Sequence, residues 1–128
     1  ISLYNQEWKV YLDSRQKSEF DIARAAWIGD YLDPYTFLSL GISDSGNNHS
    51  HWKSDRFDAL MRATTQTLDP TLRFQLFQQA ESELIEAMPF IPLFFYVRSL
   101  LIDESVQGWH SNILDYHPYQ YLRLEAPQ

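Results

Sequence analysis

The stretch from Phe20 to Pro34 places the strongest constraint on this chain. It opens as a mostly apolar run with small residues, which is typical of a buried β-strand. Two full charges, Arg24 and Asp30, interrupt the run. A regular strand places both on one face, about 20 Å apart at ~3.3 Å per residue. Because buried charges need partners, each predicts either an ion pair within the protein or a ligand group of opposite charge.

An aromatic side chain and several small residues lie between these two charges. Trp27 stands between them, and Ala25, Ala26 and Gly29 are small enough for another backbone to approach closely. A cation, an anion, an aromatic wall and an open strand edge suit an extended zwitterionic peptide, which adds to a sheet through its main chain. In the alternative interpretation, the charges pair within the fold and the tryptophan packs in the core. The residues alone leave both interpretations open.

Five ordered segments of the chain resemble one known family. The string AWIGDYLDPYTFL at 26–38 resembles the ligand-lining segment of oligopeptide- and dipeptide-binding proteins, the extracytoplasmic receptors of ATP-driven peptide importers. The resemblance continues through NQEWK at 5–9, SDSGNN at 43–48, WKS at 52–54 and PLFFYV at 92–97. It implies an α/β fold: a C-terminal lobe fragment of a two-lobed periplasmic-binding-protein (type II) fold, with a mixed sheet and flanking helices.

The resemblance also implies two parts within the chain. Residues 1–97 are expected to belong to the C-terminal peptide-binding lobe. Residues 98–128 are expected to form an inter-lobe crossover and a tail that returns to an N-terminal lobe outside this sequence. The chain begins with Ile1 and shows no signal peptide, so we expect it to be a portion of a longer receptor. No apolar run reaches ~18 residues, and no segment is expected to span a membrane.

The charged residues of the central stretch have implied roles as anchors of a peptide. By resemblance, Asp30 accepts the α-ammonium of the peptide in a charge-assisted pair. Arg24, and Arg15 at the end of the preceding helix, attract the carboxylate, and the length of the ligand decides which of them is used. In isolation Arg15 is also explained by the preference of cations for helix C-termini.

Aromatic side chains and backbone complete the implied site. Trp8 and Trp27 form walls of roomy side-chain pockets, although core packing is the default explanation for each. Tyr96 lines the cleft in the resembling proteins; a core tyrosine with a satisfied hydroxyl is the equal alternative. Many relatives carry at the position of Ile28 a cysteine that forms a disulfide, and this chain lacks it. The expected ligand-binding residues are Asp30, Arg24, Trp27, Trp8, Arg15, Ala26, Ile28 and Tyr96.

Composition and missing motifs argue against other classes of function. Ten Lys and Arg against seventeen Asp and Glu give a net charge of −7, which argues against nucleic acid. With no cysteine, and with incomplete metal-ligand patterns at 44–55, neither a metal nor a cofactor is expected. No nucleophile elbow or His-Glu-x-x-His occurs, so no catalytic residue is expected. A carbohydrate-active domain that uses Asp30 and Asp33 is the remote alternative.

The function that we expect is capture of short peptides outside the cytoplasmic membrane and delivery to the membrane permease subunits of an ABC importer. Receptors for murein tripeptide, dipeptide, metal chelates or haem are the alternatives within the family. The expected location is the periplasm, or a lipid anchor on the extracellular face in a Gram-positive source. A different interpretation is that this segment is a structural lobe that binds nothing measurable alone, because charge pairs in water contribute only ~0–1 kcal/mol.

Local patterns predict the helices, strands and loops. Helices are predicted over 2–16, over 34–40 with Asp33 as N-cap, after the N-cap Ser54, and from Asp69-Pro70 to about Met88. The last two are predicted to be packing elements. Ser43 to His51 is predicted to be a solvated loop. Ile91 to Ile102 is predicted to be a buried strand, and Tyr119 to Leu124 a final strand.

Overall fold

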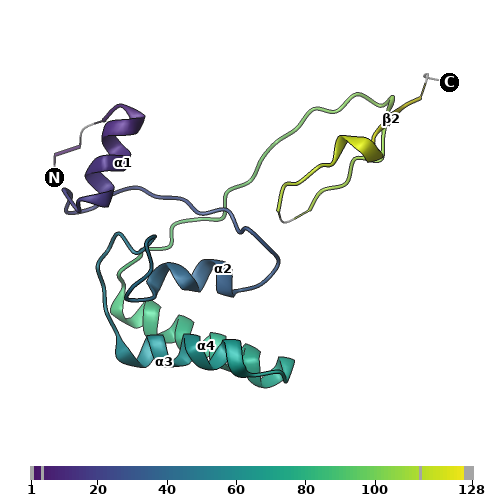
Figure 1. The fold of residues 1–128 in the computed structure, drawn as a ribbon. Coiled ribbons are helices and arrows are strands. Elements are labelled where there is room, and N and C mark those ends of the chain that lie inside the picture. Colours follow the sequence, from purple (N-terminus) through teal and green to yellow (C-terminus); the bar gives the residue numbers. More distant parts are fainter. Residues whose placement is uncertain (1, 4, 113, 126–128) are drawn as a thin grey trace.

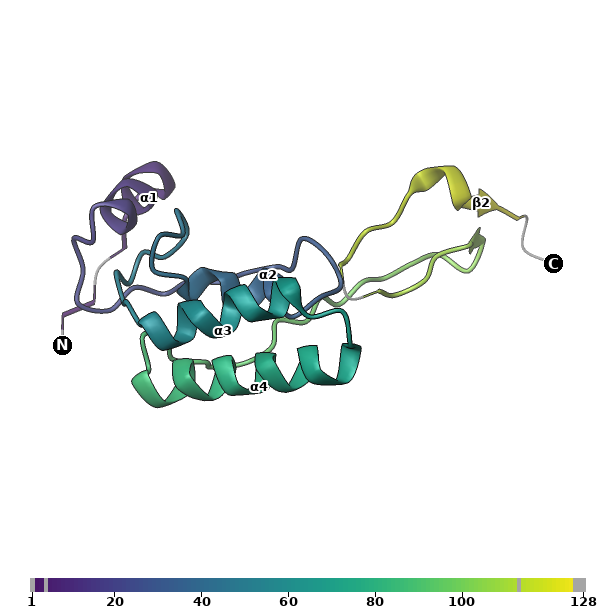
Figure 2. The same cartoon turned by 60° about the horizontal axis from the view of Figure 1, so that its bottom comes forward.

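The computed structural model describes residues 2–3, 5–112 and 114–125. In chain order the elements are α1 (Trp8–Gln16), α2 (Tyr35–Leu38), the 3-10 helix η1 (Ser39–Gly41), α3 (Asp55–Gln66), α4 (Pro70–Ala87), β1 (Val106–Gln107), the 3-10 helix η2 (Tyr119–Tyr121) and β2 (Arg123–Leu124). Helices α3 and α4 lie side by side and α2 packs against them (Figure 1). Both views place α1 at one end of this helical layer, while the arm that carries β1 and β2 projects from the other end (Figure 2).

The two long helices begin at the caps that the sequence predicts. The Ser54 hydroxyl accepts a hydrogen bond from the Phe57 backbone N–H at 3.1 Å. The Asp69 carboxylate accepts one from the Leu72 N–H at 2.9 Å, and Pro70 takes the first helical position, where its missing N–H costs nothing. Helix α4 ends at Ala87, and its C-cap Met88 adopts the left-handed conformation with φ 54°. These capping predictions are confirmed.

The core is the interface between α2, α3 and α4. Phe57 and Ala80 have no exposed surface, and Met61 has 1%. Because these positions recur at helical spacing, each helix turns one apolar face inward. The buried apolar residues of the described chain are Leu38, Phe57, Met61, Phe77, Ala80 and Leu84. The predicted packing role of α3 and α4 is therefore confirmed.

The loop at 43–51 is irregular, as predicted, but it is not simply solvated. Asn48 is only 6% exposed, and its amide donates to the backbone oxygens of Ile42 at 3.2 Å and Trp52 at 2.8 Å. Its side-chain oxygen accepts from the Ser50 hydroxyl at 2.7 Å. A buried amide with its bonds made fixes the shape of the loop between η1 and α3.

Two helix predictions need correction at their starts. Helix α1 begins at Trp8 instead of residue 2, because the Glu7 carboxylate caps it by accepting from the Lys9 N–H at 2.9 Å. The predicted helix over 34–40 is split into α2 and η1, with Pro34 at the N-cap position. Asp33 lies one residue earlier, yet its carboxylate still accepts from the Tyr35 N–H at 2.9 Å.

The predictions of buried strands were wrong for both long apolar runs. Residues 23–29 and 91–102 belong to no strand or helix, and the whole of 91–102 is exposed, with Phe95 at 96%. An apolar run indicates strand propensity, but a strand forms only beside a hydrogen-bonded neighbour. Within the described residues the single sheet is the pair β1–β2.

The predicted final strand is shortened to two residues. Residues 119–121 form η2, and only Arg123 and Leu124 pair in antiparallel register with Gln107 and Val106. A hydrogen bond from the Glu125 N–H to the Ser105 oxygen at 2.8 Å extends this contact. The division at residues 97 and 98 stays a prediction. No helix of the described residues is long and apolar enough to cross a bilayer.

Gly41 offers a direct test of core packing. A Cβ built there would lie 2.6 Å from Leu84 Cδ1 and 3.1 Å from Phe57 Cζ. We expect Gly41→Ala to lower the free energy of unfolding by about 1–3 kcal/mol, the usual cost of overpacking, as measured by urea unfolding. Gly46→Ala is the matched control, because a Cβ at that position would meet nothing within 4 Å. Equal stabilities for the two variants would contradict the tight packing at Gly41.

Candidate ligand-binding site

Asp30 lies in a turn that is anchored by a buried hydroxyl. Its backbone N–H donates to Thr36 Oγ1 at 3.1 Å, and the same hydroxyl donates to Asp30 Oδ2 at 3.4 Å. Thr36 is 2% exposed, whereas Asp30 is exposed. The Asp30 carboxylate is therefore accessible to solvent, while the buried Thr36 hydroxyl holds the turn that carries it.

A second acid in the same turn is paired within the protein. Asp33 accepts two hydrogen bonds from the Arg73 guanidinium of α4, at 2.5 and 3.0 Å. Arg73 Nε also donates to the Thr64 backbone oxygen at 3.0 Å, and its guanidinium lies 4.6 Å from the centre of the Phe77 ring. The Arg73 hydrogen bond lowers the pKa of Asp33. Asp33 is therefore structural, and sequence reasoning missed the pairing role of Arg73.

The Tyr31 hydroxyl, next to the two acids, has a raised pKa. Tyr31 lies between them in sequence, and partial desolvation, followed by the Asp33 charge, raises the pKa of its hydroxyl. The Asp30 carboxylate also contributes to this rise. The Arg73 charge acts in the opposite direction and lowers the pKa of the same hydroxyl.

The other end of the candidate site is an aromatic and cationic cluster on α1. The Trp8 ring stacks on Tyr11 with 5.5 Å between ring centres, and the Arg15 guanidinium lies 5.6 Å from the Tyr11 ring. The Tyr11 hydroxyl donates to the backbone oxygen of Arg24. The structure thus brings Trp8, Arg15 and the Arg24 backbone together. Tyr11 was not predicted; its spacing from Trp8 and Arg15 along one helix face was the available signal.

The remaining expected residues are not gathered into one cluster. Trp27 is 37% exposed and Ile28 is 67% exposed. Both residues, together with Ala26, lie on the segment 23–29, which pairs with no strand. Tyr96 is 75% exposed, with its ring 6.0 Å from that of Phe94, so the core alternative for Tyr96 was wrong. Core packing for Trp8, at 65% exposed, was wrong as well. The contact of these residues with a ligand stays a prediction.

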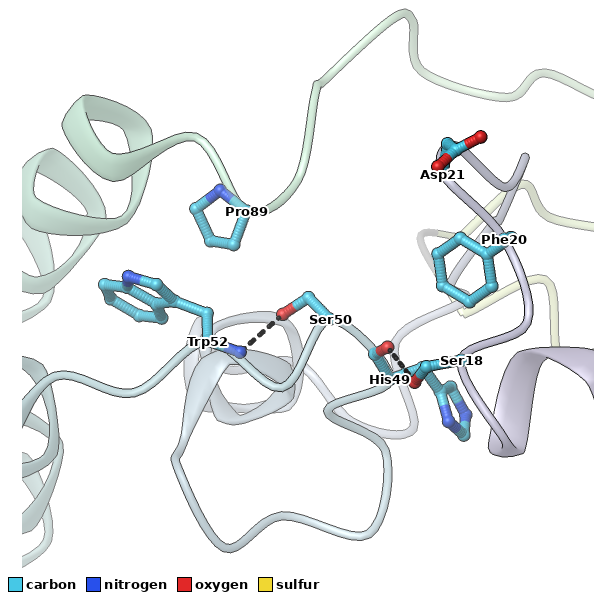
Figure 3. Close-up of a pocket in the computed structure, with 7 residues that line it drawn as sticks. All are labelled: Ser18, Phe20, Asp21, His49, Ser50, Trp52 and Pro89. Atoms are coloured by element: carbon cyan, nitrogen blue, oxygen red, sulfur yellow. Dashed lines mark hydrogen bonds between the residues drawn. The ribbon is translucent and has the colours of Figure 1, made fainter.

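None of the expected residues lines the cavity in Figure 3. It has a volume of about 390 Å³ and is lined by Ser18, Phe20, Asp21, His49, Ser50, Trp52 and Pro89. The Ser18 hydroxyl donates to the His49 backbone oxygen at 3.3 Å, and the Trp52 N–H donates to Ser50 at 3.2 Å. Desolvation, with the Arg15 charge nearby, lowers the pKa of His49. Two hydrogen bonds thus join residues that line this cavity.

No three His, Asp or Glu side chains within the described ranges gather where they could hold a metal ion.

The pair between Asp33 and Arg73 predicts a dependence of stability on pH. Because the pKa of Asp33 is lowered in the folded state, its contribution is present above the unfolded pKa of about 4 and is lost as pH falls through the folded value. We expect unfolding by urea to show this loss below about pH 4, and we expect Asp33→Asn to remove it.

The same pair predicts the effect of substitution near neutral pH. Arg73→Met should lower the free energy of unfolding by about 1–3 kcal/mol, because it leaves the half-buried Asp33 carboxylate without its charged donor. The control is Lys17→Met, which breaks the exposed pair with Asp13 and should cost less than about 1 kcal/mol. Equal costs for the two variants would show that Arg73 does not anchor the turn.

Comparison with known proteins identifies the segment. No family model matches the sequence. It is 41% identical over 109 residues to the periplasmic oligopeptide-binding protein OppA of Salmonella typhimurium, across 85% of this chain and 20% of that protein. It is 38% identical over 127 residues to the probable deoxycholate-binding periplasmic protein YgiS of Escherichia coli, across 98% of this chain and 24% of that protein. The sequence matches a portion of the peptide-binding proteins OppA, MppA and DppE.

Solved structures of such proteins contain the same fold. The chain superposes on Haemophilus influenzae OppA in complex with RPPGFSPFR with a TM-score of 0.85 and 31% identity, covering 96% of this chain and 24% of that structure. The solved neighbours are two-lobed periplasmic binding proteins, which confirms the expected fold class. The chain spans about a fifth to a quarter of the length of the relatives that it matches.

Proposed function

We propose that this chain works as part of a receptor that captures short peptides outside the cytoplasmic membrane and delivers them to the permease subunits of an ABC importer. The observation that carries the proposal is the exposed Asp30 carboxylate. It lies in a turn that hydrogen bonds to the Thr36 hydroxyl hold in place. The relatives named as periplasmic oligopeptide-binding proteins support the same activity and a periplasmic location.

The proposed binding mode uses the two ends of the site for the two ends of a peptide. Asp30 accepts the α-ammonium in a charge-assisted pair. The extended backbone at 26–29 belongs to no strand, so its N–H and C=O groups are suited to bind a peptide main chain, independently of side-chain identity. Arg24 and Arg15 attract the carboxylate.

The exposed aromatic rings of the site would accommodate many different side chains of a bound peptide. Trp8 and Trp27 are partly exposed, and Tyr96 is largely exposed, so each has free ring surface for a ligand side chain. Broad aromatic surfaces contribute apolar contact without a fixed hydrogen-bond pattern. We therefore infer that affinity arises from the termini and main chain of the peptide and depends little on its side chains.

The protein is proposed to bind without catalysis. A pair of carboxylates that cleaves glycosidic bonds needs one acid that is free to donate a proton. Asp33 instead accepts hydrogen bonds from Arg73 and from the Tyr35 N–H, which stabilise its charged form. The carbohydrate-active alternative that pairs Asp30 with Asp33 is disfavoured on this ground.

A bile-acid receptor is the second candidate. The observation in its favour is the match to YgiS, a probable deoxycholate-binding protein, over 98% of this chain. A bile acid has a carboxylate and a rigid apolar body, which suit Arg24, Arg15 and the tryptophan walls. It has no ammonium, so Asp30 would then contribute no ion pair. The contribution of Asp30 to binding therefore separates the two candidates.

Calorimetric titration of a receptor of full family length that carries this segment tests the proposal. The ligands are one tripeptide, its N-acetylated form and deoxycholate. We expect the free peptide to bind and acetylation to weaken binding strongly. Asp30→Ala should lower the affinity for the free peptide by about 2–5 kcal/mol, because it leaves the ligand ammonium unpaired. Asp21→Ala, which removes an exposed acid outside the site, is the matched control and should have little effect.

Two results would overturn the proposal. If free and acetylated peptides bind equally well, Asp30 does not hold the ammonium. If deoxycholate binds and neither peptide does, the receptor belongs with the second candidate. In that case Asp30→Ala should leave the affinity for deoxycholate unchanged.

A further inference from the structure

The Thr36 hydroxyl contacts Asp30 at two points. A hydroxyl has one proton to donate and lone pairs that accept. Thr36 Oγ1 accepts from the Asp30 backbone N–H at 3.1 Å and directs its proton to Asp30 Oδ2 at 3.4 Å. One group therefore restrains the backbone and the carboxylate of the same residue. The second contact, at 3.4 Å, is at the long end of hydrogen-bond distances.

The position of Thr36 is restricted on one side by hydrogen bonds of the turn and on another by close packing. Its backbone N–H donates to the Asp33 oxygen at 3.2 Å, and the Asp33 carboxylate binds Arg73 on α4. On the other side lies Gly29, where a Cβ would come within 3.2 Å of the Thr36 methyl and 3.0 Å of the Phe37 ring. With 2% of its surface exposed, Thr36 has little room to change rotamer.

We infer that Thr36 is a positioning residue, which orients the Asp30 carboxylate toward the ammonium of a bound peptide. This inference rests on the proposed peptide-receptor function. A freely rotating surface aspartate loses conformational entropy when it binds a cation, whereas a carboxylate that is already held loses less. Thr36 therefore contributes to recognition of the ammonium although it does not contact the ligand.

Two substitutions at one position separate orientation from packing. Thr36→Val keeps the shape and removes the hydroxyl, while Thr36→Ser keeps the hydroxyl and removes a methyl group. The measured quantity is the acetylation ratio, defined as the Kd for the N-acetylated tripeptide divided by the Kd for the free tripeptide. A purely structural role of Thr36 would weaken both ligands alike and leave this ratio unchanged.

Calorimetric titration in the receptor of full family length provides the readout. We expect Thr36→Val to reduce the acetylation ratio about tenfold, the effect of one hydrogen bond to a charged group. Thr36→Ser should keep the ratio within about threefold of that of the unsubstituted receptor, since it retains both contacts. If Thr36→Val does not fold, Thr36→Ala takes its place, with the same expected reduction.

The outcomes distinguish this inference from the function on which it rests. A large ratio in the unsubstituted receptor that stays equally large without the hydroxyl overturns the positioning role and leaves the peptide-receptor function intact. A ratio near one in the unsubstituted receptor overturns the peptide-receptor function, and the positioning role with it. A ratio that falls in Thr36→Ser as far as in Thr36→Val assigns the effect to the methyl group and also overturns the positioning role.

Discussion

The bidentate pair between Arg73 and Asp33 is the contact on which the candidate site depends. It joins α4, which belongs to the helical core, to the turn that carries Asp30. Arg73 also donates to the Thr64 oxygen at the end of α3 and packs on the Phe77 ring. One side chain therefore connects both long helices to the turn. A guanidinium suits this role, because its planar set of donors binds a carboxylate and a carbonyl in fixed directions at once.

In this turn a buried residue lies next to an exposed one. Thr36 is buried, while Asp30 is exposed six positions before it. A binding carboxylate must be accessible, and it must also keep its orientation, which a buried hydroxyl can provide. At the α1 end, Tyr11 has a role like that of Thr36. Its ring contacts Trp8 and Arg15, and its hydroxyl donates a hydrogen bond to the Arg24 backbone oxygen. Both ends of the candidate site are thus supported by side chains that are not among the expected ligand-binding residues.

The extended runs show where prediction from sequence failed. Ile91 to Ile102 has the composition of a buried strand, yet Phe95 and Leu101 are almost wholly exposed. Burial of a strand depends on neighbouring strands and on layers above and below it, and a single run does not specify them. The chain spans about a quarter of the length of its solved relatives. The apolar composition of this run therefore did not predict its conformation or its burial.

The sequence by itself determined the elements whose bonds are local. Ser54, Asp69 and Pro70 start α3 and α4, and the spacing of Phe57 and Phe77 sets their inward faces, because caps and helical periodicity involve residues a few positions apart. The resemblance pointed to Asp30 and Trp8. Only the tertiary structure decided that Arg73 pairs with Asp33, forty positions away, and that Thr36 holds Asp30. The contact between Arg73 and Asp33 depends on where the packed helices bring distant segments together, which local propensity does not encode. The contact between Thr36 and Asp30 spans only six positions, but it needs a turn whose shape the helix and strand patterns of the sequence did not predict.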